Sequence, residues 1–166
     1  MSFPPHSPPP PDPISGKLQP LSLESVVDPD NIRRAWKKVR RNRGACGVDL
    51  ITIREMAEDF DSEWWPVRRQ LLDGTWKTRQ LRFAEIPKAD GRSRSLAIPT
   101  VMDRVIQQAI TQVLTPWWEP TFHPASFGYR PGRSSHQAVL FALAHLNRSA
   151  PAEKIPQILH LDIEDF

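Results

Sequence analysis

The residue types best suited to chemistry lie in the run from Ile158 to Phe166. As a β-strand, this run would direct Asp162 to the face opposite Leu161 and Ile163. A carboxylate at the end of a mostly buried strand is costly unless a partner pairs with it, and a divalent cation is one such partner. Because one carboxylate rarely holds a catalytic pair of magnesium ions, further ligands are expected beyond this run.

Two other segments combine residue types that suit phosphates and bases. A turn with an Asp-Gly signal joins the predicted strands Leu81–Pro87 and Arg94–Ile98, and pairing would gather cations around it. Residues 126–133 interleave arginines, which match phosphate oxygens, with aromatic rings, which stack on bases. Each pattern alone also fits an ordinary solvated surface. The residues concerned are Lys88, Arg92 and Arg94 at the turn, and Phe127, Gly128, Tyr129, Arg130 and Arg133 in the second segment.

Charge along the 166 residues is uneven. Residues 1–30 and 149–166 each carry a net charge of −3, whereas residues 31–148 contain 20 Lys and Arg against 11 Asp and Glu. A basic centre favours a polyanionic partner, with a plain charged surface as the alternative. Seven of the thirteen residues 31–43 are basic, which predicts a phosphate-contacting helix. The cations of its first turns are Arg33, Arg34, Lys37 and Lys38.

The single cysteine, Cys46, excludes an internal disulfide and fits a reducing compartment. A small loop residue is a better interpretation of Cys46 than a reactive thiol. No apolar run reaches the length of a membrane span, and the N-terminus lacks the pattern of a signal peptide. We therefore expect a cytoplasmic protein without a membrane partner. The oligomeric state is left open.

The predicted elements form an α+β arrangement with an incomplete antiparallel sheet. Eight prolines in the first 20 residues predict that residues 1–21 form a disordered tail. Asp30 is the expected N-cap of the first helix and Gly44 its stop. Capping boxes are predicted at Thr52, Thr100 and Ser134. The helices are expected over residues 31–42, 53–60, 62–72, about 101–114 and about 135–147, and a strand over residues 158–164.

The helix after Thr100 has two distinct sides. Its apolar residues recur at helical spacing and predict a core face. Its polar side is either solvated or a ligand surface. The apolar set is Val101, Val105, Ile106, Ala109, Ile110, Val113 and Leu114, and the polar set includes Arg104, Gln107, Gln108 and Gln112.

Taken together and in order, these segments resemble a known family. Residues 84–100 and 103–109 closely resemble the fingers region of group II intron reverse transcriptases, and residues 126–138 resemble the next block. Gly47-Val48-Asp49 is similar to the N-terminal block of that family, and residues 161–166 to its first catalytic-aspartate block. The resemblance covers roughly residues 31–166.

The resemblance implies that residues 22–166 form the fingers and the start of the palm of a right-hand polymerase. The implied reaction is RNA-directed DNA synthesis with a template or intron RNA, a DNA primer, a dNTP and two Mg²⁺ ions. Asp162 would be the first metal-binding aspartate, with the carbonyl of Ile163 beside it. Lys88 and Arg94 would bind the triphosphate, Phe166 the nucleotide sugar, and Arg104, Gln107, Gln108 and residues 127–133 the template strand.

Some residues of this chain differ from the family pattern at positions close to the implied site. Leu50 stands where the family usually has Gly, and Glu164-Asp165 makes the site more acidic than usual. The remaining catalytic aspartates are absent from the 166 residues, so we expect this chain to be inactive by itself. A non-catalytic, maturase-like module that binds intron RNA is the alternative function. A basic domain unrelated to polymerases is the third.

Overall fold

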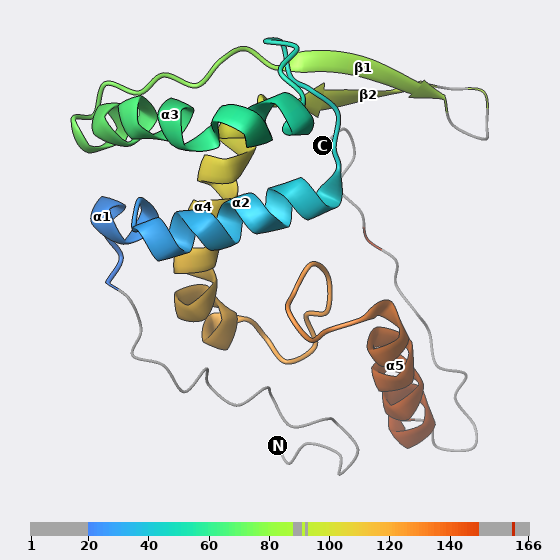
Figure 1. Ribbon diagram of the computed structural model, residues 1–166. Coiled ribbons are helices and arrows are strands. Elements are labelled where there is room, and N and C mark those ends of the chain that lie inside the picture. The colour runs from blue at the N-terminus through green and yellow to red at the C-terminus, as the bar shows by residue number, and fades with distance from the viewer. Residues whose placement is uncertain (1–19, 88–90, 92, 150–160, 162–166) are drawn as a thin grey trace. The chain divides into compact units, whose positions relative to one another are not determined.

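The computed structural model describes residues 20–87, 91, 93–149 and 161. The chain divides into two units, of which one ends at Trp118 and the other begins at Glu119 (Figure 1). Among the described residues, the first unit contains four helices and a hairpin, and the second contains a 3-10 turn and one helix. The elements are α1 (Leu23–Val26), α2 (Pro29–Asn42), α3 (Ile53–Leu72), β1 (Arg82–Pro87), β2 (Ser93–Ile98), α4 (Val101–Trp118), η1 (Glu119–Thr121) and α5 (Ser135–Ser149).

Helix α2 begins earlier than predicted. Its N-cap is Asp28, whose Oδ1 accepts from the backbone N–H groups of Asp30 and Asn31 at 3.0 and 3.2 Å. The expectation of Asp30 as N-cap was wrong because Pro29 has no N–H to leave unpaired and suits the first helical position. The expected stop at Gly44 was also one residue late. Arg43 adopts the left-handed conformation that ends the helix, with φ 47°.

Helix α3 confirms the predicted capping box, but it joins the two helices that were predicted separately over residues 53–60 and 62–72. The Thr52 backbone N–H donates to Glu55 Oε2 at 2.8 Å, and the Glu55 N–H donates to Thr52 Oγ1 at 3.2 Å. Residues 53–60 and 62–72 belong to one helix with non-helical backbone angles at Asp59. Pro66 lies inside the helix, where its missing N–H removes one backbone hydrogen bond.

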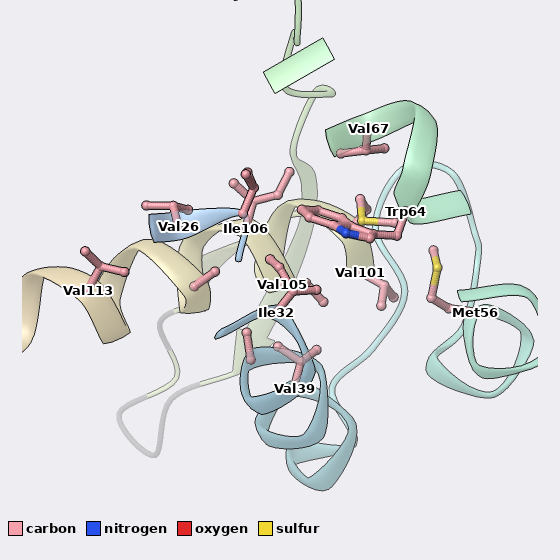
Figure 2. Close-up of a cluster of buried hydrophobic side chains, with 14 residues drawn as sticks. Val26, Ile32, Val39, Met56, Trp64, Val67, Val101, Val105, Ile106 and Val113 are labelled. Carbon is pink, nitrogen blue, oxygen red and sulfur yellow. The ribbon is translucent and has the colours of Figure 1, made fainter. Parts of the chain in front are cut away.

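The core of the first unit lies between α1, α2, α3 and α4. Figure 2 shows Trp64 reaching from α3 towards Val101 and Val105 of α4, while Ile32 and Val39 approach from α2. Most of the predicted apolar face of α4 is buried, but Ile110 and Leu114 are exposed. That part of the prediction was wrong because periodicity marks a wide apolar face without saying how much of it the neighbouring helices cover. The buried face of α4 comprises Val101, Met102, Asp103, Val105, Ile106, Ala109 and Val113.

A buried amide joins three of these helices. Asn31, which has no exposed surface, donates from Nδ2 to the carbonyls of Val26 at 2.9 Å and Ala109 at 3.1 Å. Its Oδ1 accepts from Gln112 Nε2 at 2.8 Å and from Arg34 Nη2 at 3.3 Å. Every polar atom of the side chain is therefore paired, which a buried amide requires.

The hairpin has the predicted strands and stands apart from the core. Antiparallel pairing runs from Arg82 opposite Ile98 to Pro87 opposite Ser93. Figure 1 shows the two strands extending away from the helices, and most of their side chains are exposed. Gly91 in the turn has φ 81°, a conformation that glycine adopts without strain. The sheet described is two-stranded. Of the predicted strand 158–164, only Leu161 is among the described residues, and it is exposed and belongs to no strand.

The second unit confirms the third capping box. The Ser134 N–H donates to Gln137 Oε1 at 2.9 Å, and the Gln137 N–H donates to Ser134 Oγ at 3.3 Å. Helix α5 then runs from Ser135 to Ser149, two residues past its expected end. Among the described residues, no helix of either unit is both long enough and apolar enough to cross a membrane.

We expect Asn31→Ala to lower the free energy of unfolding by about 2–3 kcal/mol, because it leaves buried carbonyls without a donor. Asn42→Ala is the matched control, since Asn42 lies exposed at the end of the same helix. We expect that control to change stability by less than about 0.5 kcal/mol. Denaturant unfolding of the two variants measures both values. If both variants lost the same free energy of unfolding, the buried hydrogen bonds of Asn31 would not stabilise the fold more than an exposed asparagine does.

Candidate nucleic-acid interface

The first turns of α2 present four cations to solvent. Arg33, Arg34, Lys37 and Lys38 are all exposed, on the side of the helix away from Ile32 and Ala35. Arg33 forms an exposed ion pair with Asp30 at 2.6 Å, which contributes little in water. All four side chains are open to solvent, where they can meet an external anion, and we call them the α2 cationic face.

A row of polar side chains connects this face to α4. Arg34 reaches Asn31, Asn31 bonds Gln112, and Gln108 Nε2 donates to Gln112 Oε1 at 3.4 Å. Gln107 is exposed one position earlier on α4. Two of the residues predicted to face a template, Gln107 and Gln108, therefore lie on a helix that packs directly beside the α2 cationic face.

Arg104, the third predicted residue of α4, has a different environment. Its Nη2 donates to the carbonyl of Ala45 at 2.6 Å, and its side chain is partly buried. Burial lowers the pKa of the guanidinium, and the nearby carboxylate of Asp49 offsets part of that shift. In this structure Arg104 holds the loop after α2 against the start of α4.

The base of the hairpin also contacts that loop. Arg82 Nη1 lies 3.1 Å from the sulfur of Cys46 and 3.5 Å from its carbonyl oxygen. Cys46 is half-buried, as a small loop residue can be. Arg94 is exposed on β2 opposite Ile86, on the same face of the hairpin as Arg82 and nearer the turn.

The second unit organises its mixed segment around one arginine. Arg130 makes a two-pronged ion pair with Glu119 Oε1, from Nε at 2.9 Å and Nη2 at 2.7 Å. Its Nη1 donates to the carbonyls of His123 at 3.0 Å and Ser126 at 2.9 Å. Sequence reasoning missed this internal role, because an arginine fork suits a carboxylate and a phosphate equally.

Several predicted site residues lie outside the described residues. These are the nucleotide-binding Lys88, Ile163 and Phe166 and the metal ligands Asp162 and Ile163, together with Arg92 of the turn. Within the described residues, no group of three or more His, Cys, Asp or Glu is arranged to hold a metal ion. The metal and nucleotide assignments therefore stay predictions.

An acidic groove was not predicted as a site. A cavity of about 320 Å³ opens along the first half of α3 and the turn before it, and four carboxylates line it. The pKa of one of them, Glu55, is lowered by hydrogen bonds from the backbone and side chain of Thr52. A groove lined by four carboxylates repels a polyanion, so it is not part of a nucleic-acid interface. Its lining is Asp49, Leu50, Ile51, Glu55, Met56, Asp59 and Glu63.

Comparison with known proteins identifies several relatives of this chain. The chain is 33% identical over 119 residues to Protein YkfC of Escherichia coli, and 33% identical over 116 residues to the group II intron-encoded protein LtrA of Lactococcus lactis. It is 44% identical over 132 residues to an uncharacterised 91 kDa protein in the cob intron of Schizosaccharomyces pombe. The chain belongs to the group II intron-encoded reverse transcriptase and maturase family.

The matches cover most of the chain but only part of each relative. They include 70%, 69% and 72% of the 166 residues, respectively. The chain spans 31% of YkfC, 19% of LtrA and 15% of the cob intron protein. No protein-family model matches the chain.

The Gly47-Val48-Asp49 block of this chain has a physical role in the structure. Gly47 is buried, and a Cβ there would lie 2.6 Å from the Cα and 2.7 Å from the N of Thr100. Asp49 Oδ1 accepts from the Ile51 N–H at 3.2 Å and closes the turn. Leu50 has φ 59°, so it occupies a left-handed position that the Gly usual in the family would adopt without strain.

We expect Gly47→Ala to destabilise the first unit by about 1–3 kcal/mol, because the added methyl meets backbone that cannot move aside. Gly128→Ala is the matched control, since a Cβ at Gly128 meets nothing within 4 Å. We expect the control to leave stability unchanged within about 0.5 kcal/mol. Thermal unfolding of both variants tests the contact. A Gly47→Ala protein as stable as the parent would contradict this close approach of the two segments.

Proposed function

We propose that this chain is the fingers and the beginning of the palm of an RNA-directed DNA polymerase, and that it binds template or intron RNA. The observation that carries the proposal is the α2 cationic face, whose four exposed cations lie on a helix that packs against α4. Arg34 of this face is linked through Asn31 to Gln112 and Gln108 of α4. Cations at this density suit a phosphate backbone, and amide side chains beside them add hydrogen bonds to sugars or bases. Membership of the intron-encoded family supports RNA as the polyanion.

The nucleotide side of the proposal rests on the hairpin. Arg94 is exposed near the turn, and Lys88 follows Pro87, the last residue of the strand that leads into the turn, in the sequence. Together they would bind the triphosphate of an incoming dNTP. Asp162 and the carbonyl of Ile163 would hold Mg²⁺, which in two-metal polymerases activates the primer hydroxyl and stabilises the leaving pyrophosphate. Phe166 would contact the nucleotide sugar.

RNA binding is tested by a fourfold charge-neutralising variant of the α2 cationic face, Arg33→Gln, Arg34→Gln, Lys37→Gln and Lys38→Gln. We expect its affinity for single-stranded RNA at about 0.1 M salt to fall about 10- to 100-fold. The slope of log affinity against log salt should also decrease, by up to about 3. Fluorescence anisotropy across a salt series measures both quantities.

The matched control removes four exposed cations elsewhere in the same unit, with Arg54→Gln, Arg69→Gln, Lys77→Gln and Arg79→Gln. Both variants change the net charge by the same amount, so a difference between them reports position and not total charge. If both variants lost the same RNA affinity, binding would depend on the total charge of the chain and not on the position of the α2 cationic face. No loss in the first variant would remove α2 from the interface.

A maturase-like module that binds intron RNA without catalysis is the second candidate function. It is favoured by the same exposed cations and glutamines, which need neither a metal ion nor a nucleotide. The two functions differ in whether the hairpin binds a dNTP, because a purely RNA-binding module has no use for a triphosphate site.

We expect Arg94→Ala to weaken dNTP binding about tenfold, through loss of charge-assisted hydrogen bonds to the triphosphate. Arg82→Ala is the control, since Arg82 lies on the same hairpin face but farther from the turn. Equilibrium binding of a labelled dNTP, with inorganic tripolyphosphate as competitor, measures the effect. Absence of dNTP binding by the parent chain, with RNA binding intact, would favour the maturase-like function.

A further inference from the structure

We propose that Tyr129 stacks on an unpaired nucleobase of the bound RNA, and that Arg130 is the positioning residue that presents it. This inference deepens the proposed RNA binding and rests on it. It divides the segment 126–133 into a scaffold that faces inward and one aromatic ring that faces outward.

Arg130 is the centre of the scaffold. Its side chain is only 8% exposed, and its guanidinium bonds the Glu119 carboxylate and the carbonyls of Glu119, His123 and Ser126. The guanidinium also lies over the ring of Phe122, at 5.2 Å from its centroid. A donor fork engaged on this many acceptors has little capacity left for a phosphate.

Two turns meet at this arginine. The Ser126 N–H donates to the His123 carbonyl at 2.9 Å, and the Arg133 N–H donates to the Arg130 carbonyl at 3.3 Å. Pro131 and Gly132 occupy the centre of the second turn, and Gly132 has φ 69°, as a type II turn requires. The backbone on either side of Tyr129 is therefore held in place.

The other aromatic and cationic residues of the segment are also engaged. Phe127 packs against Phe141 of α5 with ring centroids 5.6 Å apart. The Arg133 guanidinium lies over Phe127 at 5.4 Å and donates to the Pro124 carbonyl at 3.4 Å. These contacts attach the segment to α5 and leave Phe127 and Arg133 half-buried.

Tyr129 is the exception. Its exposure is 111% of the reference value, so the whole ring is open to solvent. Its φ of 57° is a left-handed conformation that residues other than Gly, Asn and Asp rarely adopt. An aromatic ring held outward on strained backbone fits a ligand with a flat π-face, and every nucleobase has one.

The test compares two single-stranded oligonucleotides of equal length, a normal RNA and an abasic version that keeps only the backbone. We expect Tyr129→Ala to bind the normal RNA about tenfold more weakly and the abasic version as well as the parent does. Tyr129→Phe should retain the parent affinity for both, because the ring stacks without its hydroxyl. Since Tyr129 is exposed, none of these changes disturbs buried contacts.

The role of Arg130 is tested through its partner with Glu119→Ala. Removing a negative charge should strengthen phosphate binding, so the affinity for abasic RNA should hold or rise. The affinity for normal RNA should nevertheless fall several-fold if the Arg130 scaffold presents Tyr129. A rise for both oligonucleotides would overturn the positioning role.

A direct readout comes from the ring itself. The chain contains one tyrosine, so selective isotope labelling of tyrosine yields a single set of ring signals. We expect these signals to shift with normal RNA and to stay unchanged with abasic RNA. RNA binding without any ring shift, and with unchanged affinity of Tyr129→Ala, would refute the stacking while leaving RNA binding intact. No RNA binding by the parent chain would instead refute the proposed function.

Discussion

The buried amide of Asn31 sets how the helices of the first unit face one another. Apolar packing between α2 and α4 is not directional, so by itself it would tolerate some rotation of α2 about its axis. The amide tolerates little rotation, because its two donors must meet the carbonyls of Val26 and Ala109 while its oxygen meets Gln112. Fixing the rotation of α2 about its axis also fixes the directions in which its exposed cations leave the helix. The α2 cationic face therefore has one orientation relative to the glutamines of α4, as a surface that binds an extended polyanion needs.

Local signals predicted the elements well. The capping boxes at Thr52 and Ser134 and the hairpin strands all depend on residues a few positions apart, so a short stretch of sequence contains both partners of each interaction. The features that were missed join distant positions. Asn31 bonds a carbonyl 78 residues away, and Gly47 packs against the backbone of Thr100. No local pattern distinguishes such a residue from an ordinary surface asparagine or loop glycine.

In the candidate site, too, the sequence predicted residue types but not tertiary contacts, and the arginines show this most clearly. Residue type predicted phosphate contact for Arg33 and Arg130, and the family resemblance implied template contact for Arg104. The structure leaves Arg33 exposed, whereas Arg104 bonds the carbonyl of Ala45 and Arg130 bonds Glu119. A guanidinium satisfies carbonyls and carboxylates with the same fork that it offers to phosphate, so composition cannot separate the two uses. Burial separates them, and burial depends on tertiary packing.

Left-handed backbone at non-glycine residues links local strain to the proposed surfaces. Arg43, Leu50 and Tyr129 each adopt positive φ, at a cost of about 1–2 kcal/mol per residue. Such conformations persist only where neighbouring contacts outweigh that cost. The Asp49 turn does so for Leu50, and the Arg130 scaffold does so for Tyr129. The two cases differ in what the strain achieves. At Leu50 a glycine would serve the same turn without the strain, whereas at position 129 a glycine would remove the ring that the scaffold holds out to solvent.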